Sequence, residues 1–299
     1  MAWIELRLAV AAGEQERAER ALEEAGALSV TLLDAEADTP NERAILEPGV
    51  GETPLWDMLV LAALFDGDTD RSGLLHVMGE LLPEIDPQRI AFREVADQNW
   101  TRVWMDDFKP MRFGRRLWIY PWNIEPPTDA DAVVVRLDPG LAFGTGTHPT
   151  TALCLEWLDG LDLRGAHVID YGCGSGVLAI AALKLGAALV DGIDNDPQAL
   201  QASRDNAGRN GVSDALSLYM PEAFEPQPAD VFVANILAGP LAELAPRFAA
   251  CTKPGGPFAI SGILASQQHD LLDRYSPWFD ELAVDTREDW VRISGVRRR

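Results

Sequence analysis

Three glycines at alternating positions, Gly172, Gly174 and Gly176, form a segment whose backbone could bind a ligand. An apolar run that ends in Asp170 precedes them, and an apolar helical pattern begins directly after them at Val177. This order predicts a strand, a tight turn and a helix. Glycine lets the backbone approach a ligand closely, and the start of a helix offers unpaired N–H groups. The segment is therefore predicted to be a cofactor loop, with contacts from Asp170, Gly172 and Gly174.

A second acidic residue indicates which part of a cofactor this region binds. Asp194 follows a short predicted strand over 190–193, about twenty residues after the glycines, where an acid can bind a pair of ribose hydroxyls. A dinucleotide site would have glycine or alanine at the position of Val177. The spacing G-x-G-x-G after Asp170 resembles instead the S-adenosylmethionine loop of class I methyltransferases, and that cofactor carries no phosphate. We therefore expect S-adenosylmethionine as the cofactor; the alternative is a plain turn between a strand and a helix.

A loop rich in glycine and threonine, residues 137–151, leads into the next predicted helix. Because such a loop is costly to order, its composition favours a role as a lid over the cofactor. Three of its side chains are predicted to contact the cofactor: Phe143, Thr145 and Thr151. His148 is one of only four histidines and is a candidate for the site, with packing or capping as the alternative. Thr150 or Thr151 could also simply cap the helix that follows.

Asn235 ends a predicted buried strand and is followed by Ile-Leu-Ala. In a doubly wound fold this strand end lies near the mouth of the cofactor crevice, where a carboxamide can accept a hydrogen bond from an amine. Methyltransferases of planar amines usually have Asn/Asp-Pro-Pro-aromatic here, and the missing prolines and aromatic ring favour an aliphatic amine. We expect Asn235 to be catalytic and to contact the cofactor, with His148 as a catalytic candidate for relaying the proton to solvent. The alternative for Asn235 is an ordinary residue at a strand end.

The elements that position these residues alternate between helix and strand from residue 151 onward. Such alternation predicts an α/β fold with a doubly wound, mostly parallel sheet, the Rossmann-like class I methyltransferase fold, and a ligand at the carboxyl ends of its strands. Six strands are predicted in this part of the chain, at 168–170, 190–193, 229–235, 258–261, 282–285 and 290–293, and two more, at 117–120 and 132–137, lead into it.

The first third of the chain is predicted to be a separate small domain, residues 1–96. Strands are expected at 3–10, 28–33 and 89–95, helices at 14–25 and 72–82, a possible short strand at 44–46, and either state at 56–65. Strands interleaved with two helices suggest a small α+β ferredoxin-like domain, and no catalytic group is evident in it. A linker helix is expected over 97–110, with Trp100 and Trp104 on one face. The methyltransferase domain would then span 111–299.

Charge and cysteine content narrow the class of partner. The formal net charge is −22, and the first 100 residues contain 21 acidic and 7 basic residues. This excess would repel a phosphate backbone, so we expect no direct DNA binding, and it would attract a basic protein. Solubility alone is the alternative explanation.

The three scattered cysteines, Cys154, Cys173 and Cys251, predict reduced thiols in the cytoplasm and no metal site. No apolar run approaches twenty residues and no signal peptide is evident, so no membrane association is expected.

Taken together, these motifs resemble the ribosomal protein L11 methyltransferase family over essentially the whole chain. The lid sequence Pro-Gly-Leu-Ala-Phe-Gly-Thr-Gly-Thr-His-Pro-Thr-Thr and the turn Asn-Ile-Leu-Ala carry most of the resemblance. The resemblance implies a substrate-recognition domain, a linker and a class I methyltransferase domain. It implies methylation of the α-amine and the lysine ε-amines of that basic ribosomal protein, up to trimethylation. Carried over by motif, cofactor contacts fall on Thr151, Gly172, Asp194 and Asn235.

Two other functions remain open at this point. One is methylation of amino groups in nucleic acid, against which the acidic surface and the missing Pro-Pro-aromatic argue. The other is a catalytically idle module that only binds the cofactor, against which the intact loop and lid argue.

Overall fold

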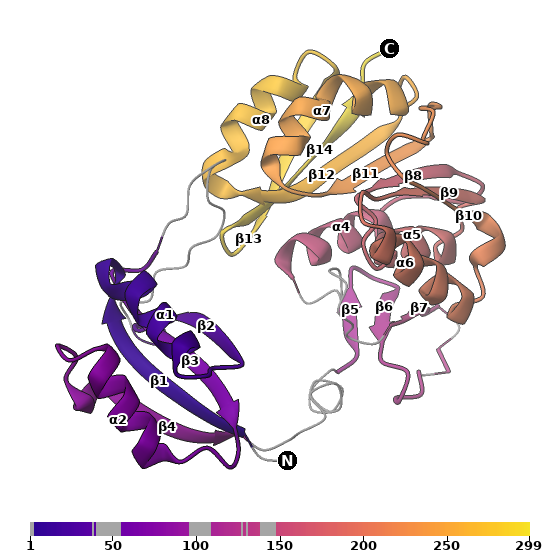
Figure 1. The fold of residues 1–299 in the computed structure, drawn as a ribbon. Coiled ribbons are helices and arrows are strands. Elements are labelled where there is room, and N and C mark those ends of the chain that lie inside the picture. The colour runs from indigo at the N-terminus through magenta and orange to yellow at the C-terminus, as the bar shows by residue number, and fades with distance from the viewer. Residues whose placement is uncertain are drawn as a thin grey trace. The chain divides into compact units, whose positions relative to one another are not determined.

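The computed structural model comprises two compact units, Met1–Asn99 and Trp100–Arg299 (Figure 1). The structure describes residues 3–37, 39, 55–95, 109–126, 128–129, 131–137 and 148–299. The possible strand at 44–46 lies outside these residues, as do most of the predicted linker helix and its two tryptophans. Most of the predicted lid also lies outside them.

The first unit contains a four-stranded antiparallel sheet with the strand order β2-β3-β1-β4. Its elements follow one another as β1 (Trp3–Ala11), α1 (Gln15–Glu24), β2 (Ser29–Asp34), β3 (Met58–Asp66), α2 (Arg71–Leu81) and β4 (Ile90–Val95). This order of elements and strands is the ferredoxin-like arrangement, as predicted. The apolar stretch at 56–65, whose state was open from sequence, forms β3.

Alternation along β1 explains why this segment is a strand with one buried face. Ile4, Leu6, Leu8 and Val10 are buried, and the residues between them are half-buried. Side chains two residues apart point to the same face of a sheet, so these four contribute to one side. Both helices add side chains to the core that β1 helps to form.

The second unit contains a seven-stranded sheet with the order β10-β9-β8-β11-β12-β14-β13. The five strands from β10 to β12 pair in parallel, and β14 pairs antiparallel with both β12 and β13. Its elements are α4 (Pro149–Asp159), β8 (His167–Tyr171), α5 (Val177–Lys184), β9 (Leu189–Ile193), α6 (Pro197–Arg209), β10 (Leu216–Tyr219), β11 (Val231–Asn235), α7 (Ala238–Cys251), β12 (Pro257–Leu264), α8 (Gln268–Tyr275), β13 (Phe279–Arg287) and β14 (Trp290–Arg297). The prediction of a doubly wound, mostly parallel sheet is confirmed. The edge strand β10 was missed, because four residues give little periodic signal.

Helices cover both faces of this sheet (Figure 1). On β11, Val231 and Val233 belong to the core shared with α4 and α5. Phe232 and Ala234 belong to the core shared with α7 and α8. A strand buried on both faces reads as a continuous apolar run, which is why no alternation is visible there.

A smaller three-stranded sheet precedes α4 and consists of β5 (Met111–Phe113), β6 (Leu117–Tyr120) and β7 (Val133–Arg136). Its apolar side chains join the core beside α4 and α5. Within the described segments, no helix combines the length and the apolar character that crossing a bilayer requires.

Candidate functional site

The glycine loop connects the end of β8 to the start of α5, as the sequence predicts. Gly172, Gly174 and Gly176 have φ values of +81°, +55° and +80°, a region that favours glycine. The N–H groups of Gly172 and Cys173 donate to the carbonyl of Ile193 at 2.7 and 3.0 Å. These bonds attach the loop to the end of β9.

Two polar side chains of α6 support the loop from behind, and sequence reasoning missed both. Ser203 Oγ donates to the Gly174 carbonyl at 2.8 Å, and Asn206 Nδ2 donates to the Ser175 carbonyl at 2.9 Å. Ser203 and Asn206 are three residues apart and therefore lie on one helix face. Polar residues on the buried face of a predicted helix were the signal that could have identified them.

Asp194 lies directly against the glycine loop. Its Oδ2 accepts from Gly174 N at 2.8 Å, and its Oδ1 accepts from Asp196 N at 3.0 Å. Each carboxylate oxygen has a second lone pair, so this half-buried group can still accept from ribose hydroxyls. Asp194 therefore orders the loop and presents a negative charge beside it.

Asp170 is fully buried beneath the loop. Its Oδ2 accepts from Ala179 N in α5 at 3.0 Å, and its Oδ1 has no hydrogen-bond partner in the described part of the chain. Burial raises the pKa of Asp170 to about 7; the Ala179 N–H lowers this pKa, and the charge of Asp194 raises it further. A buried carboxyl with one unpaired oxygen is suited to stabilising a nearby cation.

Asn235 and Thr151 meet at the end of β11, although 84 residues separate them in sequence. Asn235 Nδ2 donates to Thr151 Oγ1 at 3.3 Å. Thr151 is only 2% exposed, so its side chain faces the protein and holds the carboxamide. With the amide nitrogen bound in this way, the Asn235 oxygen is the atom that can accept from a substrate amine.

His148 is the N-cap of α4, so the structure shows the capping role that was the alternative for His148, and neither Thr150 nor Thr151 occupies the N-cap position. The His148 Nδ1 accepts from Thr150 N at 3.3 Å and lies 2.7 Å from Thr150 Oγ1. The ring packs edge-on against Trp290, with 4.7 Å between centroids. Burial lowers the pKa of His148, while the charge of Glu288 raises it. Because Nδ1 is the capping acceptor, the neutral ring carries its proton on Nε2.

The structure describes some of the predicted cofactor contacts and not others. Phe143 and Thr145 lie outside the described residues. Asp170, Asp194 and Asn235 are at or just beyond the carboxyl ends of β8, β9 and β11. The sheet order reverses between β8 and β11, and ligands of doubly wound folds bind at that switch point.

The chemistry of these groups fits a phosphate-free, cationic nucleoside. Two carboxylates, a carboxamide and backbone N–H groups converge at the loop, and none of the side chains placed there is basic. Two carboxylates beside the loop would repel a phosphate, whereas the hydroxyls of a ribose and a sulfonium or ammonium group suit such acceptors. Among the residues that the structure describes, no group of three or more metal-ligating side chains occurs.

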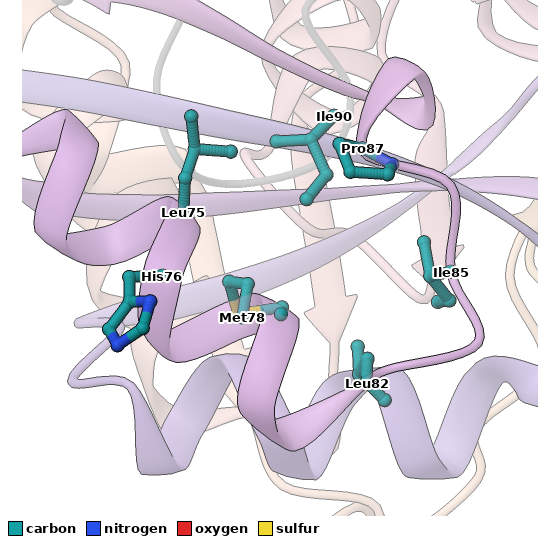
Figure 2. A pocket seen from close by; sticks show the side chains of 8 residues that line it. Leu75, His76, Met78, Leu82, Ile85, Pro87 and Ile90 are labelled. Carbon is teal, nitrogen blue, oxygen red and sulfur yellow. The ribbon is translucent and has the colours of Figure 1, made fainter.

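A groove lies in the first unit, where α2 faces the segment leading into β4 (Figure 2). This groove has a volume of about 200 Å³. It is mostly apolar and is lined by Leu75, His76, Met78, Gly79, Leu82, Ile85, Pro87 and Ile90. Its lining contains no pair of groups suited to catalysis, so the groove is a candidate for binding.

The comparisons with a family model, with related sequences and with a solved structure all point to one protein family. The family model "Ribosomal protein L11 methyltransferase (PrmA)" matches residues 2–298. Proteins named ribosomal protein L11 methyltransferase from Xanthomonas euvesicatoria pv. vesicatoria and Stenotrophomonas maltophilia are each 57% identical, with full coverage of both chains. The crystal structure of a ribosomal protein L11 methylase from Lactobacillus delbrueckii subsp. bulgaricus is 29% identical, with a TM-score of 0.57. That match covers 64% of this chain and 99% of the other, whereas the sequence matches extend over both units.

Proposed function

The chain belongs to the ribosomal protein L11 methyltransferase family, and we propose that it methylates the α-amine and the lysine ε-amines of that ribosomal protein. Family membership makes it an S-adenosylmethionine-dependent protein methyltransferase. The observation that carries the choice of an amine acceptor is the place of Asn235. Its carboxamide ends β11 at the switch point of the sheet, with its nitrogen bonded to Thr151.

The residues around the glycine loop supply what this cofactor needs. When bound, S-adenosylmethionine provides a methyl group on a positively charged sulfur. We propose that Asp194 accepts hydrogen bonds from the ribose hydroxyls and that the negative charge of Asp170 stabilises the cationic end. Gly172 and Gly174 leave room for close approach of the backbone. Phe143 and Thr145 are proposed to cover the cofactor.

We propose that Asn235 orients the amine so that its lone pair is aligned with the methyl group of the cofactor. An in-line displacement depends mostly on this alignment. The attacking amine must be neutral, and for a lysine of pKa about 10.4 this costs roughly 4.6 kcal/mol at pH 7. Removal from water and a nearby positive charge both lower the pKa of that amine. The His148 Nδ1 is already an acceptor within α4, so we propose that the proton leaves directly to solvent.

The first unit is proposed to dock the ribosomal protein. Residues 1–99 carry 21 acidic and 7 basic residues, and a basic partner would be attracted by this charge. The apolar groove beside α2 offers a complementary surface for an exposed apolar side chain of that partner (Figure 2). A ribosomal protein as substrate implies that the enzyme acts in the cytoplasm.

Transfer of label from methyl-labelled S-adenosylmethionine to purified ribosomal protein L11, with ribosomal RNA as the competing acceptor, tests the proposal. We expect label only on the protein, and intact-mass analysis should show additions of methyl groups. Asn235→Ala should lower turnover by about tenfold or more at saturating cofactor, because its contact forms with the amine. Label on RNA, or turnover of Asn235→Ala within about twofold of the parent, would contradict the proposed acceptor or the proposed role of Asn235.

A further inference from the structure

Ile236 lies in a narrow space between two glycines that come from different segments. On one side, a Cβ atom at Gly172 of the glycine loop would overlap the Cγ2 methyl of Ile236. On the other side, a Cβ atom at Gly262 of β12 would overlap the Ile236 carbonyl oxygen. The two glycines have φ values of +81° and +87°. Ile236 is therefore held through its side chain by one segment and through its backbone by the other.

Backbone pairing restrains the same turn. Asn235 pairs with Ser261 between β11 and β12, and Ile236 N donates to the Ser261 carbonyl at 3.1 Å. The pairing of β12 with β14 changes register between Ser261 and Ile263, so Gly262 lies in a bulge. Bulges next to functional sites redirect the chain locally. The bulge brings the Gly262 backbone against the residue that follows Asn235.

We infer that Ile236 is a positioning residue for methyl transfer, because it fixes the glycine loop relative to the carboxamide of Asn235. This inference rests on the proposed function, in which the loop holds the methyl donor and Asn235 orients the amine. Displacement of one reacting group by about 1 Å can cost on the order of a hundredfold in rate. A methyl group packed against Gly172 is thus well placed to control turnover without touching either reactant.

Two substitutions separate this contact from general packing. Ile236→Val keeps the Cγ2 methyl that faces Gly172, whereas Ile236→Leu keeps the volume but loses that methyl. At saturating cofactor and ribosomal protein, we expect kcat to fall about tenfold or more in Ile236→Leu and about threefold or less in Ile236→Val. Calorimetry should give a cofactor Kd within about threefold of the parent for both. Ile293→Leu makes the same chemical change at a buried position of β14 and measures the general cost.

A second measurement needs neither cofactor nor turnover. In the cofactor-free protein, Gly172→Ala should shift the side-chain amide resonances of Asn235, because the new methyl group must displace Ile236. In an Ile236→Ala background there is no Cγ2 atom to displace, so that shift should be at most about half as large. The resonances are assigned by their disappearance in Asn235→Ala.

Equal loss of kcat in Ile236→Leu and Ile236→Val would overturn the inference. So would a kcat loss in Ile293→Leu as large as in Ile236→Leu, or an Asn235 shift of the same size in both backgrounds. Absence of methyl transfer by the parent enzyme would refute the proposed function instead. In that case the resonance comparison would still decide whether Ile236 couples the loop to Asn235.

Discussion

Asp170 should make the stability of this protein depend on pH in an unusual direction. Burial raises its pKa from the ordinary 3.8 to about 7, so the native state keeps a proton that the unfolded chain loses. The free energy of unfolding should therefore fall as pH rises between about 4 and 7 and stay level above that window. At pH 8 the native protein must hold an ionised, buried carboxylate whose Oδ1 has no hydrogen-bond partner among the described residues.

The size of the effect follows from the shift in pKa. A change of about three units corresponds to roughly 4 kcal/mol over the full window, since one unit is worth about 1.4 kcal/mol. About 3 kcal/mol of this should fall between pH 5 and pH 8. Other groups titrate in the same range, so the relevant quantity is the difference between the parent and Asp170→Asn. The variant should gain stability relative to the parent as pH rises, because asparagine does not ionise.

Urea unfolding of both proteins at half-unit steps from pH 5 to pH 8 measures this difference. Asp162→Asn is a suitable control, because its hydrogen bonds with Arg164 lower the pKa of Asp162 to about 2, well below the window. Its curve should run parallel to that of the parent. Parallel curves for the parent and Asp170→Asn would refute the reasoning, since they would mean that Asp170 titrates alike in both states.

The same ionisation bears on the proposed site. A cationic cofactor near Asp170 would favour its ionised form, so binding at pH 6.5 should release a proton. Calorimetric titrations in buffers of different ionisation enthalpy detect this release, which Asp170→Asn should abolish.

Two further predictions concern the cofactor site and the first unit. Asp194→Ala should weaken binding of S-adenosylmethionine by roughly 1–3 kcal/mol in calorimetry, through loss of its proposed hydrogen bonds to ribose and its observed bond to Gly174 N. Asp196→Ala, which removes only the side-chain cap of α6, should leave this affinity unchanged, and equal losses in the two variants would contradict a specific role for Asp194. Leu75→Gln in the groove should lower kcat/KM for the ribosomal protein by about fivefold at unchanged cofactor affinity, because Leu75 is an exposed apolar residue of the groove. Leu28→Gln, at an exposed leucine outside the groove lining, should have little effect on kcat/KM. Equal behaviour of the two variants would argue against docking in the groove. Added salt should weaken the activity of the parent on the protein substrate.

Local rules were sufficient for much of the site. The strand, glycine loop and helix around Gly174 depend on residues within one short segment, so spacing alone predicted them. The place of Asp194 after the next strand followed from the same alternation. For His148 these rules left a site role, packing and capping open. The structure shows that its ring caps α4 and packs against Trp290, a neighbour from β14 that local spacing does not indicate.

Other features depended on pairing between distant segments. The apolar stretch at 56–65 fits a helix or a strand when read alone, and antiparallel pairing with both β1 and β2 makes it β3. The hydrogen bond between Asn235 and Thr151 links residues 84 positions apart. Neither the pairing of β3 nor this hydrogen bond leaves a signal within the roughly 11 to 18 residues over which sequence periodicity is analysed.

The sequence by itself determined the class of fold, the glycine loop between β8 and α5 and the residues that end the central strands, because hydrophobic period, glycine and chain order act over short distances. Which atoms pack against those residues was decided only by the tertiary structure. Gly172 is predictable as a site for close approach, yet what approaches it in the folded chain is the methyl group of Ile236, held from behind by Gly262. Close packing between segments depends on strand register and on a single bulge, and these are set only when the whole sheet has formed.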